Sequence, residues 1–193
     1  MIKKTENLIL ISNYCDKFNR TIATIVKWSV LLMISIGAWN VIGRYLGVAI
    51  GYNLSSNRLI EAQWYLFSFI FLLGFSWTLQ KQDHVRVDIL QGNLKEKRKV
   101  QLEIIGTIFL LLPFAIGVLI ISINPTIQSW RINELSPDPG GLPRYLIKTL
   151  IPLGFFLLII QAISEAIKNF SKLKINKSLI KRSIRNSSLE KES

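Results

Sequence analysis

The residue types that most often do chemistry are few in this chain, and they lie near the ends of its apolar runs. There is one histidine, His84, and one cysteine, Cys15. Glu61 and Glu103 stand at the starts of two apolar runs, and Glu165 follows a third. A carboxylate that couples ion movement to transport usually lies deeper in the membrane, where its burial is costly. The pattern argues against an ion-driven transporter formed by this chain alone.

The same scarcity argues against an enzyme or an electron carrier. A single histidine cannot supply the paired axial ligands of a membrane dihaem cytochrome. A single cysteine excludes a disulfide within the chain and a metal site of several thiolates. The sequence contains no Gly-rich phosphate loop and no Ser/His/Asp set. We predict no catalytic residue, cofactor or metal, and we interpret Cys15 as a small apolar residue.

Four apolar runs predict an all-α integral membrane protein with four transmembrane helices. They cover about residues 22–43, 62–79, 102–123 and 145–163. A helix needs roughly 20 apolar residues to cross the hydrocarbon core, and flanking residues extend the shorter runs. The second and third runs lack the polar face that a soluble bundle helix keeps. We expect residues 1–170 to form one transmembrane domain and 171–193 to form a flexible basic tail, with no separate soluble domain.

The net charge of +12 is distributed unevenly along the chain. Residues 1–27, the loop between the second and third runs, and the C-terminal part from Lys168 onward together hold 19 Lys and Arg residues. The two other connections hold only 4. Because cation-rich loops stay in the cytoplasm, we predict that both termini are cytoplasmic. We expect the basic tail to lie against anionic lipid headgroups, and we do not expect nucleic-acid binding.

An amphipathic segment precedes the first run. Asp16, Lys17, Asn19 and Arg20 occupy one face of a helix. The opposite face is apolar, with spacings of three and four residues, and contains Leu8, Ile11, Cys15, Phe18, Ile22 and Ile25. Such a helix either lies in the cytoplasmic interface with its apolar face in the acyl boundary, or packs against a partner helix.

A few polar and aromatic residues stand out within the runs and their connections. Asn40 is the strongest buried polar candidate, and an interhelical hydrogen bond explains it. Trp64 lies near the end of its run, as interfacial anchors do. After the second run, His84, Arg86 and Asp88 belong to a dense polar loop, which we expect to fix how the second and third helices meet. Before the fourth run, the prolines and glycines of Ser-Pro-Asp-Pro-Gly-Gly-Leu-Pro predict a tight irregular path.

Two stretches of the chain resemble one protein family. The second run and its loop read EAQWYLFSFIFLLGFSWTLQKQDHVRVDIL, with Glu61 at the start, Gly74 within the run and the polar loop after it. The later stretch reads SPDPGGLPRYLIKTLIPLGFFLLIIQAISEAI. Over about residues 25–168, the chain is similar to the small membrane subunit (DctQ-like) of tripartite ATP-independent periplasmic (TRAP) transporters. The later stretch looks like a branch associated with 2-oxo acids or other carboxylates.

The resemblance implies a role in the bacterial inner membrane. The small subunit would carry no transport site and would brace a large multispan subunit, which imports a carboxylate by a sodium-driven elevator motion. A periplasmic substrate-binding protein would deliver the substrate. The alternatives are an autonomous small four-helix transporter and a membrane assembly factor. Together, the resemblance and the sequence pattern make these residues candidates for the subunit interface or for structural roles: Asn40, Glu61, Trp64, Gly74, His84, Arg86, Asp88, Asp138, Gly140 and Gly141.

Overall fold

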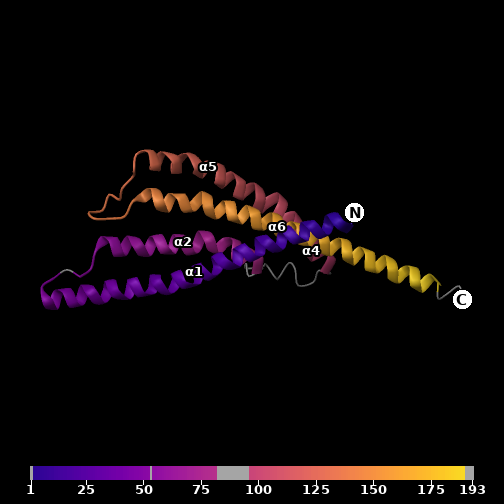
Figure 1. Ribbon diagram of the computed structural model, residues 1–193, viewed down its shortest axis with the longest axis horizontal. Helices are drawn as coiled ribbons and strands as arrows, with labels where there is room; N and C mark the ends of the chain where they lie inside the picture. Colours follow the sequence, from indigo (N-terminus) through magenta and orange to yellow (C-terminus); the bar gives the residue numbers. More distant parts are fainter. Residues whose placement is uncertain (1, 53, 82–95, 190–193) are drawn as a thin grey trace.

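The computed structural model describes residues 2–52, 54–81 and 96–189, which form long helices with short connections (Figure 1). These residues contain helices and no strand, which confirms the all-α prediction. In chain order the elements are α1 (Ile2–Ile50), α2 (Asn57–Lys81), α4 (Glu96–Gly106), the π-helical turn η1 (Thr107–Leu111), α5 (Leu112–Arg131) and α6 (Arg144–Leu189).

Four helical stretches in the described residues are long and apolar enough to cross a bilayer. They cover Ser12–Ile50, Asn57–Lys81, Arg98–Arg131 and Arg144–Ser171. Each contains one of the four predicted apolar runs, so the prediction of a four-span membrane protein is confirmed. All four stretches extend beyond the predicted runs, because polar residues at the ends of the helices lower the hydropathy without interrupting the backbone.

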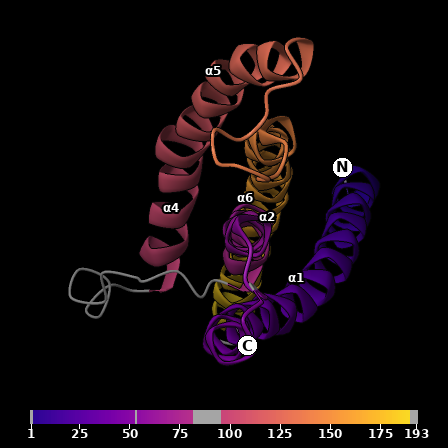
Figure 2. The same ribbon diagram turned by 90° about the vertical axis from the view of Figure 1, so that its left-hand side faces the viewer.

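The helices lie in a curved row rather than around a central axis. Seen end-on, roughly along the helix axes, α2 and α6 occupy the middle, α1 flanks them on one side, and α4 and α5 lie on the other (Figure 2). Both termini lie at one end of the molecule, which we call the terminal end (Figure 1). The opposite, loop end carries the connections 51–56 and 132–143. The side of the membrane that each end faces stays a prediction.

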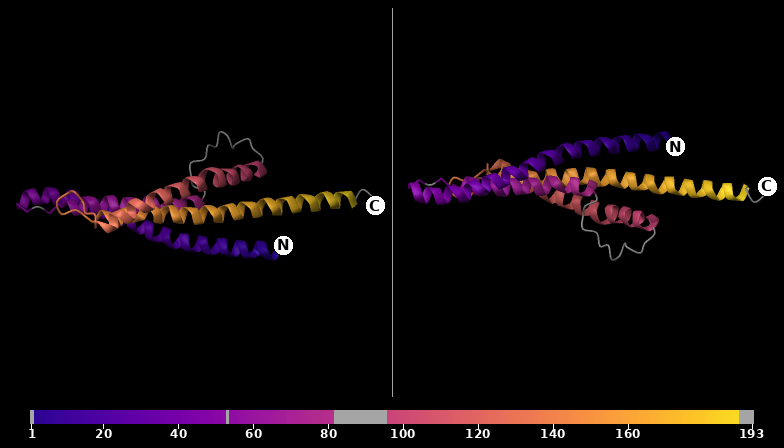
Figure 3. Two further views of the ribbon diagram at one scale, coloured as in Figure 1. Left: turned by 90° about the horizontal axis from the view of Figure 1, so that it is seen from above. Right: turned by 90° about the horizontal axis from the view of Figure 1, so that it is seen from below.

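The terminal end is the more open part of the row. The N-terminal part of α1, α4 and the C-terminal part of α6 splay apart there (Figure 3). The helix α6 continues to Leu189, through most of the segment predicted as the basic tail. The flexibility of that tail and its contact with lipid stay predictions.

The apolar core is small and lies where α2, α5 and α6 meet. Its buried members are Leu72, Ala115, Phe155 and Leu158. Gly154 allows α6 to approach α2 closely, because a Cβ atom at this position would lie 2.9 Å from the backbone oxygen of Leu72. The middle of the row is therefore held by a close backbone contact and a few large side chains.

The helix α1 differs from the sequence prediction in two ways. The segment predicted as a separate interfacial helix is continuous with the first span, within the single helix Ile2–Ile50. Only part of its polar side turns inward: Ser12 and Asn19 are buried, whereas Lys17 and Arg20 are exposed. On the apolar face, Phe18 and Ile25 are more than half exposed. The apolar face therefore points away from the neighbouring helices and is open to lipid or to a partner.

Two irregular features have local causes. Gly43 and Gly47 have the four-residue spacing of glycine pairs at close helix contacts, but here they make room for the connection. Leu54 lies against Gly43, and Tyr52 lies against Gly47. The wide π-helical turn η1 directly precedes Leu112 and Pro113. Since proline lacks an N–H and its ring collides with a preceding carbonyl, a wider turn is a common accommodation.

We predict opposite effects for two matched glycine substitutions. Gly154→Ala should lower the free energy of unfolding by about 1–3 kcal/mol, because the new methyl group collides with the α2 backbone. Gly117→Ala should be neutral or stabilising by up to about 1 kcal/mol, because open space surrounds Gly117 and alanine favours a helix. Unfolding of the isolated chain in mixed micelles measures both values. Equal effects of the two substitutions would contradict the close α2–α6 contact.

Candidate functional site: polar contacts at both ends of the helix row

Polar side chains hold the helices together near the terminal end. We call this group the Gln161 cluster. It joins three helices and consists of Ser12, Asp16 and Asn19 of α1, Ser76 of α2, and Gln161, Ser164, Glu165 and Lys168 of α6.

Gln161 is the centre of the cluster and is fully buried. Its Oε1 accepts a hydrogen bond of 2.6 Å from Asn19 Nδ2. The Asn19 Oδ1 atom in turn accepts a bond of 2.8 Å from the hydroxyl of Ser76. One chain of hydrogen bonds therefore crosses from α6 through α1 to α2. Gln161 Nε2 also donates to Asp16 Oδ1 at 3.1 Å and to Glu165 Oε1 at 3.2 Å, so both polar atoms of its amide are used.

An ion-paired group flanks Gln161. Lys168 Nζ lies 2.6 Å from Asp16 Oδ2 and 2.8 Å from Glu165 Oε1. The cation of α6 therefore balances charge on α1 as well as on its own helix. The hydroxyls of Ser12 and Ser164 lie 2.5 Å apart and form a second link between the two helices. Such contacts are strong in a medium of low polarity, where an unpaired polar group is costly.

A related contact connects α6 with α4. Asn169, also buried, donates from its Nδ2 atom to Glu103 Oε2 at 3.3 Å. The sequence places Glu103 at the start of the third span but gives it no partner. In the structure, its carboxylate helps to attach α4 to the middle of the row.

The spacing of the residues explains why the cluster forms. Residues 161, 164, 165 and 168 lie on one face of α6, and residues 12, 16 and 19 lie on one face of α1. When the two helices pack, the two polar faces meet. The sequence shows the polar face of α1 but leaves open whether this segment lies at the membrane surface or packs against a partner helix. The matching spacing on α6 was the signal that could have paired the two faces.

A second group of contacts lies at the loop end, and we call it the Glu61 latch. In this group, residues of α2 hold the connection between α5 and α6. Glu61 is almost fully buried and accepts hydrogen bonds from the hydroxyl of Ser136 and from the backbone N–H of Leu142. The Arg144 guanidinium lies 3.9 Å from the same carboxylate. The remaining contacts of the latch come from Asn57, Arg58 and Tyr65, which donate to backbone oxygens of residues 139–143.

Two glycines give the connection the shape that the latch requires. Gly140 has a φ of +73°, a backbone conformation that residues with a side chain rarely adopt. A Cβ atom at Gly141 would lie 2.7 Å from Glu61 Oε2 and 2.6 Å from the Ser136 hydroxyl. Both positions therefore favour glycine, one for its conformation and the other for the close approach of Glu61.

A further ion pair fastens the same connection to α6. Glu134 accepts hydrogen bonds from the Lys148 ammonium and, at 2.7 Å, from the hydroxyl of Ser129. The bond from Lys148, followed by that from Ser129, lowers the pKa of Glu134 below its ordinary value. The carboxylate is therefore charged at neutral pH, and the pair stays formed.

The structure brings only some of the predicted candidates together. Glu61 and Gly141 are in contact, and Gly140 and Asp138 belong to the same connection, where the Asp138 side chain is exposed. Trp64 lies on the same helix as Glu61 but points outward, with 58% of its surface exposed.

Two candidates lie apart from the latch. Gly74 borders open space, so it makes no close helix contact within the described chain. Asn40 is buried, yet its Oδ1 accepts no hydrogen bond among the residues described here. The interhelical hydrogen bond expected of Asn40 is therefore not made through this oxygen.

Three candidates of the polar loop, His84, Arg86 and Asp88, lie outside the described residues. Their expected role in joining the second and third helices stays a prediction. In the chain that the structure does describe, no group of three or more His, Cys, Asp or Glu residues is placed to hold a metal ion. The two polar groups join helices and loops to one another.

Comparison with known proteins adds one match. Residues 33–172, well over half of the chain, match the family model described as "Tripartite ATP-independent periplasmic transporters, DctQ component". The matched region includes the whole Glu61 latch and the α2 and α6 residues of the Gln161 cluster. The α1 residues of that cluster precede it. Comparisons with curated proteins and with solved structures found no match.

We predict that Gln161→Leu destabilises the chain although leucine is more apolar. The substitution leaves Asn19 Nδ2 without its acceptor and removes a donor from Asp16, which should lower the free energy of unfolding by about 1–3 kcal/mol. Gln101→Leu is the matched control, because Gln101 is exposed on α4 and should change the same quantity by about 0.5 kcal/mol or less. Unfolding in mixed micelles compares the two variants. A Gln161→Leu variant as stable as the control would show that the cluster does not hold the helices.

Proposed function

The chain belongs to the family of DctQ components of tripartite ATP-independent periplasmic transporters, and from this premise we propose that it braces the large membrane subunit. As a DctQ component, it is the small subunit of a TRAP transporter in the inner membrane. The family associates with a large membrane subunit and a periplasmic binding protein. The proposal concerns what this chain contributes to that assembly.

The low self-burial of the spans carries the proposal. In the most apolar part of the first span, 0% of the residues are buried within the chain, and the fourth span reaches only 33%. Side chains such as Leu31 of α1 and Ile121 of α5 are more than half exposed. A row of helices with two open faces offers a long apolar surface to a membrane partner. Lipid then covers only the part of that surface that the partner leaves free.

The polar contacts support a rigid brace. The Gln161 cluster joins α1, α2 and α6 near the terminal end of the molecule. The Glu61 latch fixes the connection between α5 and α6 at the loop end. A support that holds against a moving neighbour needs helices that keep their mutual positions. Contacts at both ends restrain the row against both splaying and sliding.

The same contacts argue against an autonomous transporter. The carboxylates of Asp16 and Glu165 bind Lys168 and Gln161, and Glu61 binds the loop of its own chain. These groups are occupied in holding the fold. A coupling carboxylate would instead exchange ions or protons with a pathway during transport.

The transported substrate and its driving force are finer parts of the proposal. The similarity of the stretch 136–167 to one branch of the family supports a 2-oxo acid or another carboxylate as the substrate, and the family's elevator mechanism supports sodium-coupled import. In this scheme, the binding protein delivers the carboxylate, the large subunit moves it, and this chain holds the fixed part of the large subunit in place.

We predict that uptake requires this chain together with the large subunit. Liposomes that contain both membrane subunits should accumulate a carboxylate when given a sodium gradient and the binding protein. Liposomes with either membrane subunit alone should accumulate none above background. A variant of this chain with Gly117→Ala is a control that should preserve uptake, because open space surrounds that glycine. Accumulation by this chain alone would overturn the proposal and favour an autonomous transporter.

A further inference from the structure

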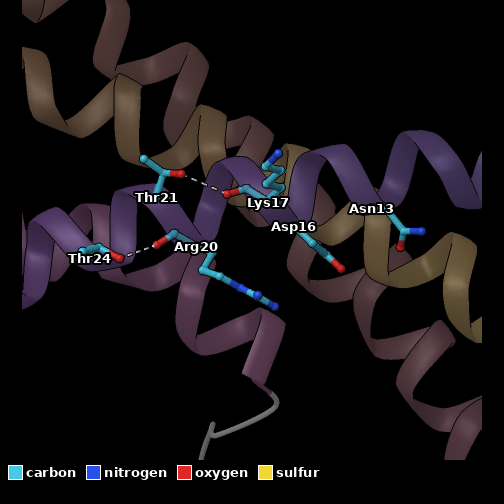
Figure 4. Close-up of a pocket in the computed structure, with 6 residues that line it drawn as sticks. All are labelled: Asn13, Asp16, Lys17, Arg20, Thr21 and Thr24. Atoms are coloured by element: carbon cyan, nitrogen blue, oxygen red, sulfur yellow. Dashed lines mark hydrogen bonds between the residues drawn. The ribbon is translucent and has the colours of Figure 1, made fainter.

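A polar cavity lies beside the N-terminal third of α1, toward the terminal end. It has a volume of about 650 Å³. The described residues that line it all belong to one face of this helix, and Figure 4 shows them together: Asn13, Asp16, Lys17, Arg20, Thr21 and Thr24. The cavity is distinct from the Gln161 cluster, with which it shares only Asp16.

The cavity carries unbalanced positive charge. Asp16, the one carboxylate among the described residues that line it, is held by Lys168 at 2.6 Å. Lys17 and Arg20 are exposed, and within residues 2–52, 54–81 and 96–189 neither forms an ion pair. They are three positions apart, so both cations lie on one side of the helix. The arrangement favours an anion and provides both a guanidinium and an ammonium group for it.

The threonines add polar surface to the cavity. Thr21 donates to the backbone oxygen of Lys17 at 3.2 Å, and Thr24 donates to that of Arg20 at 3.0 Å (Figure 4). Their hydroxyl protons are therefore used within the helix. The donors that remain for an anion are the two cations and the exposed amide of Asn13.

Exposed apolar side chains continue from the cavity along α1. Phe18 and Ile25, on the same stretch of α1, are more than half exposed, and Trp28 is 65% exposed one turn beyond Thr24. Leu32, also more than half exposed, lies 12 residues beyond Arg20, which is about 18 Å along a helix. Arg20 itself precedes the first apolar run, so we expect it to lie near the lipid headgroups, with that run in the acyl region. A cationic cavity followed along α1 by exposed apolar side chains fits a ligand with a charged head and an apolar chain better than it fits a free ion.

We propose that this cavity binds the phosphate of an anionic phospholipid from the leaflet at the terminal end. The guanidinium of Arg20 can bind two phosphate oxygens at once, and the ammonium of Lys17 adds a second charge. The acyl chains then cover the exposed apolar face of α1. The bound lipid would support the N-terminal part of α1, where the helices splay apart. This inference does not depend on the brace that we propose for the large subunit.

Lipid retention by the full chain tests the proposal. The chain is purified in a neutral detergent, incubated with phosphatidylglycerol or phosphatidylcholine, and examined by native mass spectrometry. Wild type should retain phosphatidylglycerol more strongly than phosphatidylcholine. The double variant Lys17→Gln/Arg20→Gln should bind it about 30-fold more weakly, since each cation near a membrane surface contributes about five-fold. The matched control Lys81→Gln/Arg98→Gln removes the same two residue types from exposed positions outside the cavity and should bind as wild type does.

Three results would overturn the proposal. The first is equal retention of phosphatidylglycerol by wild type and by the Lys17→Gln/Arg20→Gln variant. The second is displacement of the lipid by inorganic phosphate at millimolar concentration, which would assign the cavity to a free anion. The third is loss of the lipid when the chain assembles with its large subunit, which would assign the cavity to an acidic protein segment. If the double variant loses its helical circular dichroism, lipid retention by wild type is measured at increasing sodium chloride concentrations instead. Retention of phosphatidylglycerol should fall as the salt concentration rises. Constant retention would refute the site.

Discussion

The structure depends on hydrogen bonds between polar side chains that are buried among membrane helices. In a bilayer, lipid tails are as apolar as leucine, so no hydrophobic force draws the helices together. Close backbone contact and polar pairing must supply the attraction. In this chain, the fully buried Gln161 provides the central link, because its amide bonds to α1 and, through Asn19, reaches Ser76 of α2.

This dependence explains the open shape of the molecule. Polar links near the terminal end and the Glu61 latch at the loop end hold the row, so a large apolar core is not required. The core is correspondingly small and is centred on Leu72 and Phe155. Much of the apolar surface of α1 and α5 is then left for lipid and for the large subunit. The open shape and the proposed function therefore have the same cause, which is that the helices make few apolar contacts with one another.

The sequence predicts the spans well because hydropathy depends on composition alone. It also identifies the family, through the stretch that begins at Glu61 and the Pro/Gly-rich connection. It fails where the outcome depends on which faces meet. In sequence, Asp16 and Asn19 of α1 look like part of a face exposed to headgroups, and only α6 shows that they have buried partners. Gly43 and Gly47 resemble a helix-packing pair, but they contact the following connection. Glu61 is notable in sequence, yet nothing there reveals that it bonds to Ser136 and Leu142.

A distance measurement across the row tests the central claim, that this chain is a rigid support. Spin labels at Ile34 of α1 and Ile121 of α5, both exposed, can be attached in a Cys15→Ser background and measured by double electron–electron resonance in the assembled transporter. If the chain is a brace, the distance should change by no more than about 2 Å between resting and transporting conditions, which is the scale of small helix adjustments. A shift of one helical turn or more, about 5 Å, would show that the chain moves with the substrate and would contradict the account.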